Sequence, residues 1–261
     1  MNRFQGEIKY GAIVIFMFVI AVIALIRPTP GFIHTKVTPQ SLPHIDSNRS
    51  DGIEKNTKPL YLSGIDVSHY QGKVDWAQVV QDDIHFVYLK ATDGITYTDP
   101  TFHANQKFLI RNTTPYGAYH FFEPNDNGVK QAENFLAQVK VHKNMLPPVL
   151  DVEISRNIEK KLLQKRVRQW LETVEAKIGC KPIIYSYSSF YEKYLGDSFQ
   201  DYHFWLADYA KKPQLPSSIK QWLFWQHSQR GRVDGVQVMV DKNWFKGDKD
   251  DLVKTICKLQ T

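Results

Sequence analysis

Two acidic residues lie two positions apart at the end of a short apolar run, in the stretch Pro147–Glu153 (PPVLDVE). On a β-strand, residues i and i+2 point to the same side with Cα atoms roughly 6.6 Å apart, so Asp151 and Glu153 would face each other. Like charges at that spacing raise one pKa and give a protonated acid beside an ionised partner. Such a pair can protonate a glycosidic oxygen and stabilise the cationic sugar that forms. The alternative is structural, because both carboxylates could instead cap the following helix.

Other polar residues follow apolar runs in the same way, and they favour the catalytic interpretation. Each lies at or just beyond the end of a run with the length of a strand: Asp66, Lys90, Tyr119, His120, Asp151, Glu153, Tyr185, Asp208 and Gln226. Parallel β/α barrels build their active sites at the carboxyl ends of their strands, where such side chains converge. We expect Lys90 to pair with the acidic cluster and hold carboxylates ionised, although it could simply extend its amine to solvent.

The elements that must position these residues alternate between strands and helices from Tyr61 onward. Eight apolar runs have the length of strands: Leu62–Val67, Ile84–Lys90, Tyr116–Phe122, Val149–Glu153, Ile183–Ser186, His203–Ala207, Leu223–His227 and Val236–Asp241. Helical patterns lie between some of them, at Thr101–Ile110, Val129–Val139 and Asn157–Ile178. This alternation predicts an α/β fold, a barrel of about eight strands. The gap between His227 and Val236 cannot hold a crossover helix, so we expect an irregular barrel whose last strand is antiparallel.

The same stretches match a known family. From about Tyr61 to Gly247 the chain resembles glycoside hydrolase family 25, the lysozymes that cleave N-acetylmuramic acid linkages in peptidoglycan. The matching stretches occur in family order, at Gly64–Gly72, Leu89–Phe102, Tyr116–Phe122, Pro147–Glu153, Pro182–Ser186, Phe204–Tyr209 and Trp225–Asn243. The resemblance implies an irregular β/α barrel with fewer than eight helices. It also implies hydrolysis of the β-1,4 bond between N-acetylmuramic acid and N-acetylglucosamine, with retention through the acetamido group of the substrate.

The resemblance further implies roles for individual residues. Glu153 corresponds to the general acid, and Asp151 to the carboxylate that positions the N-acetyl group or stabilises the cationic centre. Asp66 and Asp241 correspond to two more acidic residues of the same site. Sugar contacts are implied for Tyr119, Tyr185, Trp205 and Gln226. Two alternatives stay open, a catalytically silent glycan-binding or scaffold protein on the same barrel and a chitinase-like glycosidase; the presence of all four carboxylates favours a muramidase.

The first 59 residues carry the features of a membrane-targeting segment. Gly11–Ile26 is an uncharged apolar run of 16 residues, preceded by Arg3 and Lys9. We predict a membrane anchor over residues 1–26 with a cytoplasmic N-terminus, a Pro-rich linker over 27–59 and a catalytic barrel over 60–261. A cleaved signal peptide is the alternative. Both place the barrel outside the cytoplasm.

Composition excludes some other functions. The chain has 33 Lys+Arg and 27 Asp+Glu, a formal net charge of +6, without the basic stripe that a nucleic-acid partner requires. Its histidines, including His69, His120 and His227, lack the spacing of common metal sites, so we expect neither a metal nor a cofactor. We expect a monomer whose partners are peptidoglycan glycan strands and the membrane.

The two cysteines, Cys180 and Cys257, allow opposite predictions. Export would place them in an oxidising compartment, where a pair of cysteines is usually joined. However, helices that follow the fourth and eighth strands of a closed barrel lie on opposite sides, whereas bridged cysteines need Cα atoms within roughly 7 Å. We therefore predict two unpaired thiols.

Overall fold

The computed structural model of the protein describes residues 61–258. The predicted membrane anchor (residues 1–26) and linker (residues 27–59) lie outside the described residues. Within the described part of the chain, no helix is long and apolar enough to cross a membrane.

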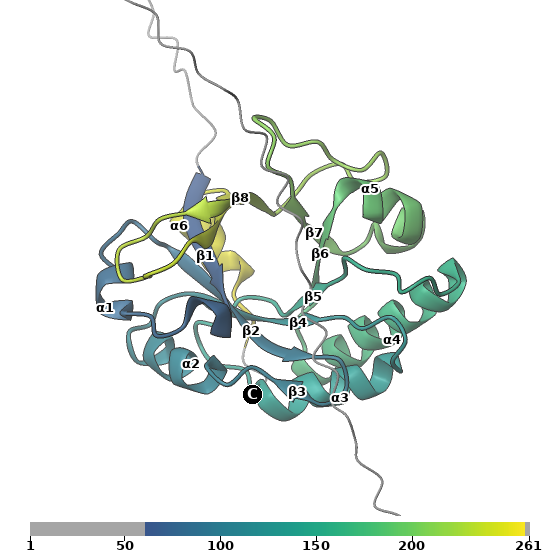
Figure 1. The fold of residues 1–261 in the computed structure, drawn as a ribbon, viewed down its shortest axis with the longest axis horizontal. Helices are drawn as coiled ribbons and strands as arrows, with labels where there is room; N and C mark the ends of the chain where they lie inside the picture. The colour runs from purple at the N-terminus through teal and green to yellow at the C-terminus, as the bar shows by residue number, and fades with distance from the viewer. Residues whose placement is uncertain (1–60, 259–261) are drawn as a thin grey trace, which may run out of the picture. The chain divides into compact units, whose positions relative to one another are not determined.

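Eight strands close into a barrel, as predicted. Along the chain they are β1 (Tyr61–Val67), β2 (Phe86–Asp93), β4 (Tyr116–Phe121), β5 (Val149–Asp151), β6 (Ile183–Tyr187), β7 (His203–Ala207), β8 (Phe224–Gly231) and β9 (Val240–Lys246). Hydrogen-bonded neighbours follow the order β1-β9-β8-β7-β6-β5-β4-β2, and β1 pairs with β2 to complete the ring (Figure 1). The short strand β3 (Tyr97–Thr98) extends the sheet beside β2.

The last strand is antiparallel to both of its neighbours, which confirms the predicted irregularity. β9 pairs in this sense with β1 and β8, whereas the other pairs of the ring are parallel. Its predicted position, Val236–Asp241, is wrong by about four residues. The reason is that β8 continues past His227 to Gly231, so residues 232–239 form the connecting loop and the returning strand starts later.

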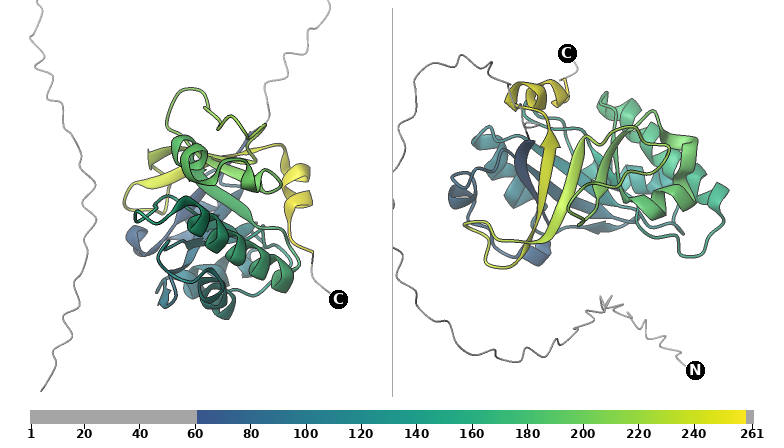
Figure 2. Two further views of the ribbon diagram at one scale, coloured as in Figure 1. Left: turned by 90° about the vertical axis from the view of Figure 1, so that its right-hand side faces the viewer. Right: turned by 90° about the horizontal axis from the view of Figure 1, so that it is seen from above.

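Six α-helices lie within residues 61–258. They are α1 (Trp76–Val79), α2 (Phe102–Arg111), α3 (Gly128–Gln138), α4 (Lys160–Ile178), α5 (Ser188–Phe190) and α6 (Lys249–Thr255). A 3₁₀ turn (His69–Gln71) follows β1, and α5 continues through a π-helical turn (Tyr191–Leu195) into a second 3₁₀ turn (Gly196–Phe199). Helices α2, α3 and α4 cover the outside of the wall near β2, β4 and β5, and α3 packs against α4 (Figures 1 and 2).

The strands alternate between side chains inside and outside the barrel, because successive residues point to opposite faces. The interior holds an apolar cluster that includes Leu62, Phe86, Tyr88, Val149, Ile183, Trp205, Phe224 and Phe245. Residues of the opposite parity pack against the helices, among them Ile65, Val87, Leu89, Leu150, Ile184 and Leu206. Gly64 provides room for the interior, since a Cβ there would lie 2.4 Å from the Phe86 ring.

The prediction of two free thiols is wrong, because Cys180 and Cys257 form a disulfide with a Cα–Cα distance of 5.4 Å. The antiparallel β9 ends at the bottom of the barrel, and α6 follows it there, with Leu252 packed into the interior cluster. Cys180 follows the end of α4, just before β6 begins at the same end of the barrel. The tail therefore runs beneath the barrel and not along its outer wall, which brings the two cysteines together.

Candidate active site

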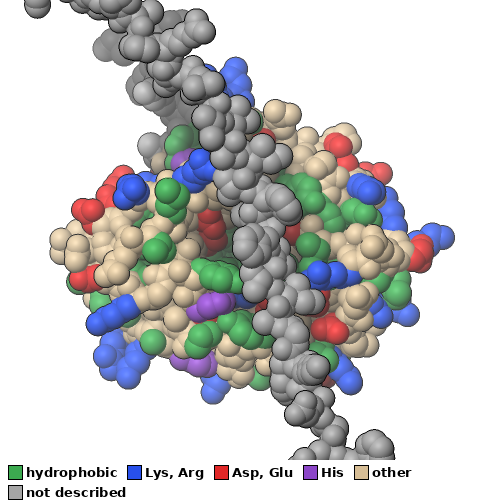
Figure 3. Space-filling view, viewed as in Figure 1, with side chains coloured by type: hydrophobic (Ala, Val, Ile, Leu, Met, Phe, Trp, Pro, Cys, Tyr) green, Lys and Arg blue, Asp and Glu red, His purple; other side chains and the backbone are tan. Residues whose placement is uncertain are grey.

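The carboxyl ends of the parallel strands surround a mouth lined by polar side chains. Each of these residues lies two or four positions beyond an interior-facing residue of its own strand, which on β4 is Gly117 against the Tyr88 ring, so the same alternation directs it inward. The set comprises Asp66 on β1, Lys90 on β2, Tyr119 on β4, Asp151 on β5, Tyr185 on β6 and Gln226 on β8. Because β9 runs in the opposite direction, Asp241 enters the mouth from the start of its strand, directly opposite Asp66. Acidic atoms are visible in the hollowed centre of this face (Figure 3).

Asp66 is held by two side-chain amides, and the orientation of one of them, Asn243, is fixed by a partner that can only donate. The indole of Trp205 can only donate, and its Nε1 donates to Oδ1 of Asn243 (3.0 Å), so the Asn243 amide nitrogen must face Asp66. That nitrogen donates to Asp66 Oδ2 (2.7 Å), and Nε2 of Gln226 donates to the same oxygen (3.0 Å). Because both partners are donors, Asp66 is the residue of this cluster that is best supported as a carboxylate.

Asp241 is the protonated partner of Asp66. Burial, followed by the negative charge of Asp66 and a hydrogen bond to it, raises the pKa of Asp241 to about 8. Burial also raises the pKa of Asp66, but the hydrogen bonds from Asn243, Gln226 and Asp241 oppose that rise. At neutral pH the two side chains therefore carry one proton, which resides on Asp241.

Glu153 lies just beyond the end of β5, which stops at Asp151, two residues earlier than predicted. The segment between them is nevertheless fixed to β6. The Val152 amide donates to the Tyr185 carbonyl oxygen (3.0 Å), and Ser186 Oγ donates to the Val152 carbonyl oxygen (2.7 Å). The carboxyl groups of Asp151 and Glu153 therefore meet in a defined arrangement, with a hydrogen bond between them.

The Asp151–Glu153 pair retains a proton. Burial, and then the negative charge of Glu153, raises the pKa of Asp151 well above its ordinary value. Burial raises the pKa of Glu153 too, while its hydrogen bond with Asp151 opposes the rise. Asp151 Oδ1 is buried without a hydrogen-bond partner among the described residues, so its ionised form is poorly compensated. In the absence of substrate, Asp151 is thus the member that holds the proton more firmly.

Lys90 forms its direct ion pair with Asp93, a residue that the sequence analysis did not select. Its Nζ lies 2.8 Å from Asp93 Oδ2 and 5.0 Å from the centroid of the Phe121 ring. Its positive charge lowers the pKa of both Asp151 and Glu153, against the larger effect of burial. The expected ion pair between Lys90 and the acidic cluster is therefore not formed, and Lys90 acts on Asp151 and Glu153 only through longer-range electrostatics.

Three of the residues selected from the sequence do not present their side chains to the mouth. Trp205 is buried in the layer below and reaches the site only through Asn243. His120 occupies a position of β4 whose side chain points away from the barrel interior. Its Nε2 lies 3.1 Å from Gln131 Oε1, and burial lowers its pKa to about 3. Asp208 accepts hydrogen bonds from backbone amides of its own loop.

Asn243 and Tyr209 belong to the site although the sequence analysis did not select them. Tyr209 and Tyr185 each donate from their hydroxyls to Gln226 Oε1, at 2.8 Å and 2.9 Å. The sequence could have identified Asn243, because it lies two residues after Asp241 and so points to the same side of the strand, into the barrel. Tyr209 lies beyond the end of β7, where parity makes no prediction.

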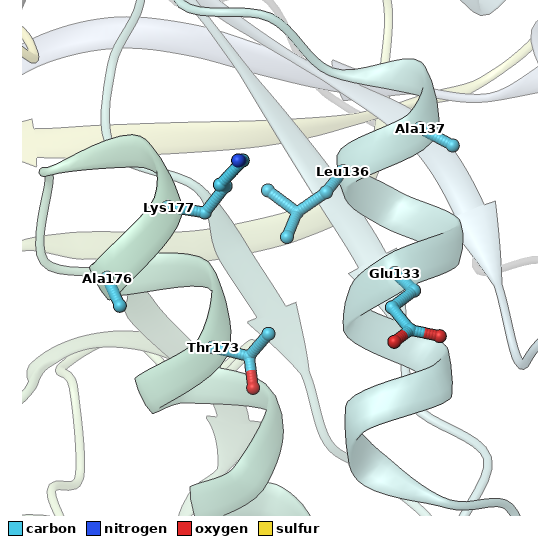
Figure 4. A pocket seen from close by; sticks show the side chains of 6 residues that line it. All are labelled: Glu133, Leu136, Ala137, Thr173, Ala176 and Lys177. Atoms are coloured by element: carbon cyan, nitrogen blue, oxygen red, sulfur yellow. The ribbon is translucent and has the colours of Figure 1, made fainter.

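A separate hollow of about 530 Å³ lies on the outer surface between α3 and α4. Its lining is mainly aliphatic, from Glu133, Leu136, Ala137, Thr173, Ala176 and Lys177 (Figure 4). None of the mouth residues contributes to it. Its side chains offer no pair of carboxyls, so the mouth is the candidate for chemistry.

Known proteins resemble this chain in both sequence and structure. An uncharacterized protein named YegX from Escherichia coli K12 is 40% identical over 196 residues, which cover 73% of this chain and 72% of that protein. Lysozyme M1 from Streptomyces globisporus is 34% identical over 200 residues, covering 71% and 68%. The crystal structure of a lysozyme from Streptomyces coelicolor matches with a TM-score of 0.72 and 31% identity, covering 75% of this chain and 96% of that one.

The family model of the glycosyl hydrolases family 25 matches residues 65–236. This range contains Asp66, Asp151, Glu153 and Gln226, and it ends just before β9 supplies Asp241 and Asn243. The resemblance inferred from sequence motifs is confirmed: the chain belongs to glycosyl hydrolases family 25 and is a glycoside hydrolase.

Proposed function

We propose that the barrel is a peptidoglycan muramidase, which hydrolyses the β-1,4 bond between N-acetylmuramic acid and N-acetylglucosamine. The observation that carries the proposal is the proton-holding pair Asp151–Glu153, which lies beside the ionised Asp66. An acid, a carboxylate partner and a fixed negative charge are the groups that cleavage through an oxocarbenium-like transition state requires. Lysozymes among the similar proteins support the same substrate.

In this proposal Glu153 is the general acid and Asp151 assists the substrate's acetamido group. When the acetamido N–H docks on Asp151, the shared proton moves to Glu153 along the hydrogen bond between the two carboxyls. Glu153 then protonates the glycosidic oxygen, the C1–O bond breaks, and the acetamido carbonyl oxygen bonds to C1. Water next attacks C1 and gives its proton to Glu153 as the acetamido bond breaks. Two displacements at C1 retain the anomeric configuration.

The other mouth residues hold the sugar and stabilise positive charge. Asp66 is ionised and lies within reach of the developing cation, while the neutral Asp241 donates to it without adding a second charge. We propose sugar contacts for Tyr119, Tyr185 and Gln226, whose polar atoms surround the carboxyls, and for Lys90 at the rim. Because Trp205 is buried, its contribution is to orient Asn243.

Incubation with purified peptidoglycan, followed by mass spectrometry of the released fragments, tests the proposed substrate. We expect new reducing ends on N-acetylmuramic acid. Reducing ends on N-acetylglucosamine would contradict the proposed bond, and binding of strands without cleavage would identify a silent scaffold.

Proton NMR of the first product tests the proposed mechanism, which requires initial release of the β-anomer. Initial release of the α-anomer would overturn participation by the acetamido group and make Asp66 or Asp241 the candidate base for an attacking water.

We also propose that residues 1–26 anchor the protein to a membrane with the barrel outside the cytoplasm. The apolar run Gly11–Ile26 and the preceding basic residues support this. Fractionation of cells that express the full chain should recover it with membranes after an alkaline wash. A soluble product shortened at its N-terminus would instead identify a cleaved signal peptide.

A further inference from the structure

One short segment beside the mouth carries a large excess of positive charge. Residues 156–168 contain six Lys and Arg side chains and one acidic residue, Glu159. They form the end of the loop after Glu153 and the first half of α4. Over the whole chain the two signs are nearly balanced, with 33 basic and 27 acidic residues, so the excess is local.

The charges of this segment do not stabilise the helix that carries them. Lys160 and Lys161 occupy the first turn of α4, where the helix dipole favours acidic residues, and that turn contains none. Lys165 lies four residues after Lys161, a spacing at which like charges on a helix repel each other. None of the three lysines belongs to an ion pair within residues 61–258. Their positions therefore favour a role in binding over a role in stability.

A fourth lysine extends this charge from α4 to a neighbouring segment. Gln164 of α4 donates from Nε2 to two carbonyl oxygens of the turn Tyr191–Leu195, both at 3.0 Å, so the helix and the turn are in contact. Lys193 lies on that turn. Lys160 approaches the residue after the turn, since a Cβ on Gly196 would lie 3.6 Å from its Nζ. We call this exposed surface the basic face, and it comprises Lys160, Lys161, Lys165 and Lys193.

The basic face borders the mouth on the side of β5 and β6. Helix α4 follows β5, and the turn follows β6, so both begin near the carboxyl ends of the strands that supply Asp151 and Tyr185 (Figure 1). Burial raises the pKa of Tyr187, the negative charge of Glu153 raises it further, and the positive charge of Lys193 opposes this rise. One side chain at the rim thus lies within range of both the proposed acid and the basic face.

We propose that the basic face binds the carboxylates of the peptide stems that substitute N-acetylmuramic acid in peptidoglycan. The inference rests on the proposed function, and it adds recognition of the peptide to cleavage of the glycan. The stems branch from muramic acid through its lactyl group, so they leave the strand close to the bond that is cleaved. Their free carboxylates are opposite in sign to the four lysines. Lysine suits such a branched ligand, because its ammonium is a point charge on a flexible stem.

Co-sedimentation with purified, insoluble peptidoglycan tests this inference, with Glu153→Gln in every protein so that the strands are not consumed. Lys161→Gln with Lys165→Gln should weaken binding about threefold to tenfold at low salt, because two charge contacts are lost. The same pair should have no effect on peptidoglycan whose carboxyls have been converted to amides with ammonia and a carbodiimide. Lys107→Gln with Arg111→Gln is the matched control, since it removes two exposed cations of the same spacing from α2.

An equal loss of binding in the two double variants would overturn the inference, because it would reflect net charge alone. A loss that persists on amidated peptidoglycan, or on strands freed of their peptides by an amidase, would also overturn it, since the ligand would then be the sugar chain.

Binding and turnover can fail separately. A protein with Glu153 intact that binds strands through these lysines but does not cleave them would contradict the proposed function and leave the basic face in place. Release of muramic acid ends, together with unchanged binding in the Lys161→Gln, Lys165→Gln variant, would support the function and overturn the basic face.

Discussion

At the scale of single residues, the site is organised by which carboxyl can carry a charge. Asn243 and Gln226 both donate to Asp66, so this side chain carries the negative charge. Its neighbour Asp241 keeps a proton as a consequence. The Asp151–Glu153 pair lacks amide donors of this kind and keeps a proton between its members. Four acidic groups in one mouth are therefore tolerated, because burial and mutual repulsion raise their pKa values and reduce the negative charge that the site holds.

The raised pKa of Asp241 predicts a pH dependence of stability. Between the ordinary pKa of 3.8 and about 8, the folded protein holds a proton that the unfolded chain has released, so stability falls as pH rises through this range. Asp241→Asn cannot ionise and should remove this component. Urea unfolding should show that the variant gains about 3–4 kcal/mol relative to the unmodified protein from pH 5 to pH 8, since each pH unit between the two pKa values is worth about 1.4 kcal/mol. An equal difference at both pH values would show that Asp241 is ionised in the fold.

At the scale of elements, the loop that follows Glu153 has a left-handed backbone conformation, which residues other than glycine rarely adopt. Arg156 and Asn157 have φ of +48° and +60°. Arg156 binds Glu123 with two hydrogen bonds, from Nε to Oε2 (3.2 Å) and from Nη2 to Oε1 (3.0 Å). The backbone of Glu123 is in turn held by the buried Gln131. The Arg156–Glu123 pair therefore connects the loop after Glu153 to the end of β4.

Removal of this connection should affect turnover more than binding. Arg156→Gln should lower kcat about threefold to tenfold with little change in KM, because the loop after Glu153 is released and small displacements of a reacting group are costly. The exchange of the two charges, in Glu123→Arg with Arg156→Glu, should recover part of the loss. Arg111→Gln, an exposed position on α2, is the control; a loss of the same size there would refute the positioning role.

The disulfide lies at the end of the barrel opposite the mouth. It joins residues 77 positions apart and ties α6 to the bottom of the barrel. Cys180→Ser with Cys257→Ser should lower the free energy of unfolding by about 2–5 kcal/mol, while kcat at low temperature changes little. Thiol labelling of the denatured, unreduced protein is a direct check, and incorporation of two labels would contradict the bridge.

At the scale of the whole molecule, the barrel separates stability from chemistry along its axis. The lower interior is apolar and closed by α6, whereas the upper interior is polar and open. Gly64 shows how closely the lower layer is packed, since a Cβ there would meet the Phe86 ring. The apolar packing of the lower layer therefore offsets the unfavourable free energy of burying charged groups in the mouth.

Features that depend on local patterns along the strands could be predicted from the sequence. Features that depend on the path of the chain between distant segments could not. The position of Asp66, Asp151 and Gln226 at the ends of strand-length apolar runs was enough to place them at one mouth, and the short gap after His227 was enough to predict an antiparallel last strand. The position of β9 and the bridge between Cys180 and Cys257 depend on where β8 ends and how the tail crosses beneath the barrel. The burial of Trp205 depends on the tilt and closure of the barrel, which no single strand encodes.

Replacement of the proposed acid tests the central claim most directly. Glu153→Gln fills the same space but cannot donate its proton usefully, so kcat on purified peptidoglycan should fall about 10²–10⁴-fold while binding to insoluble strands and the Tm stay near those of the unmodified protein. Glu133→Gln, in the hollow between α3 and α4, should leave the rate unchanged. A Glu153→Gln variant that releases muramic acid ends at the unmodified rate would contradict the account.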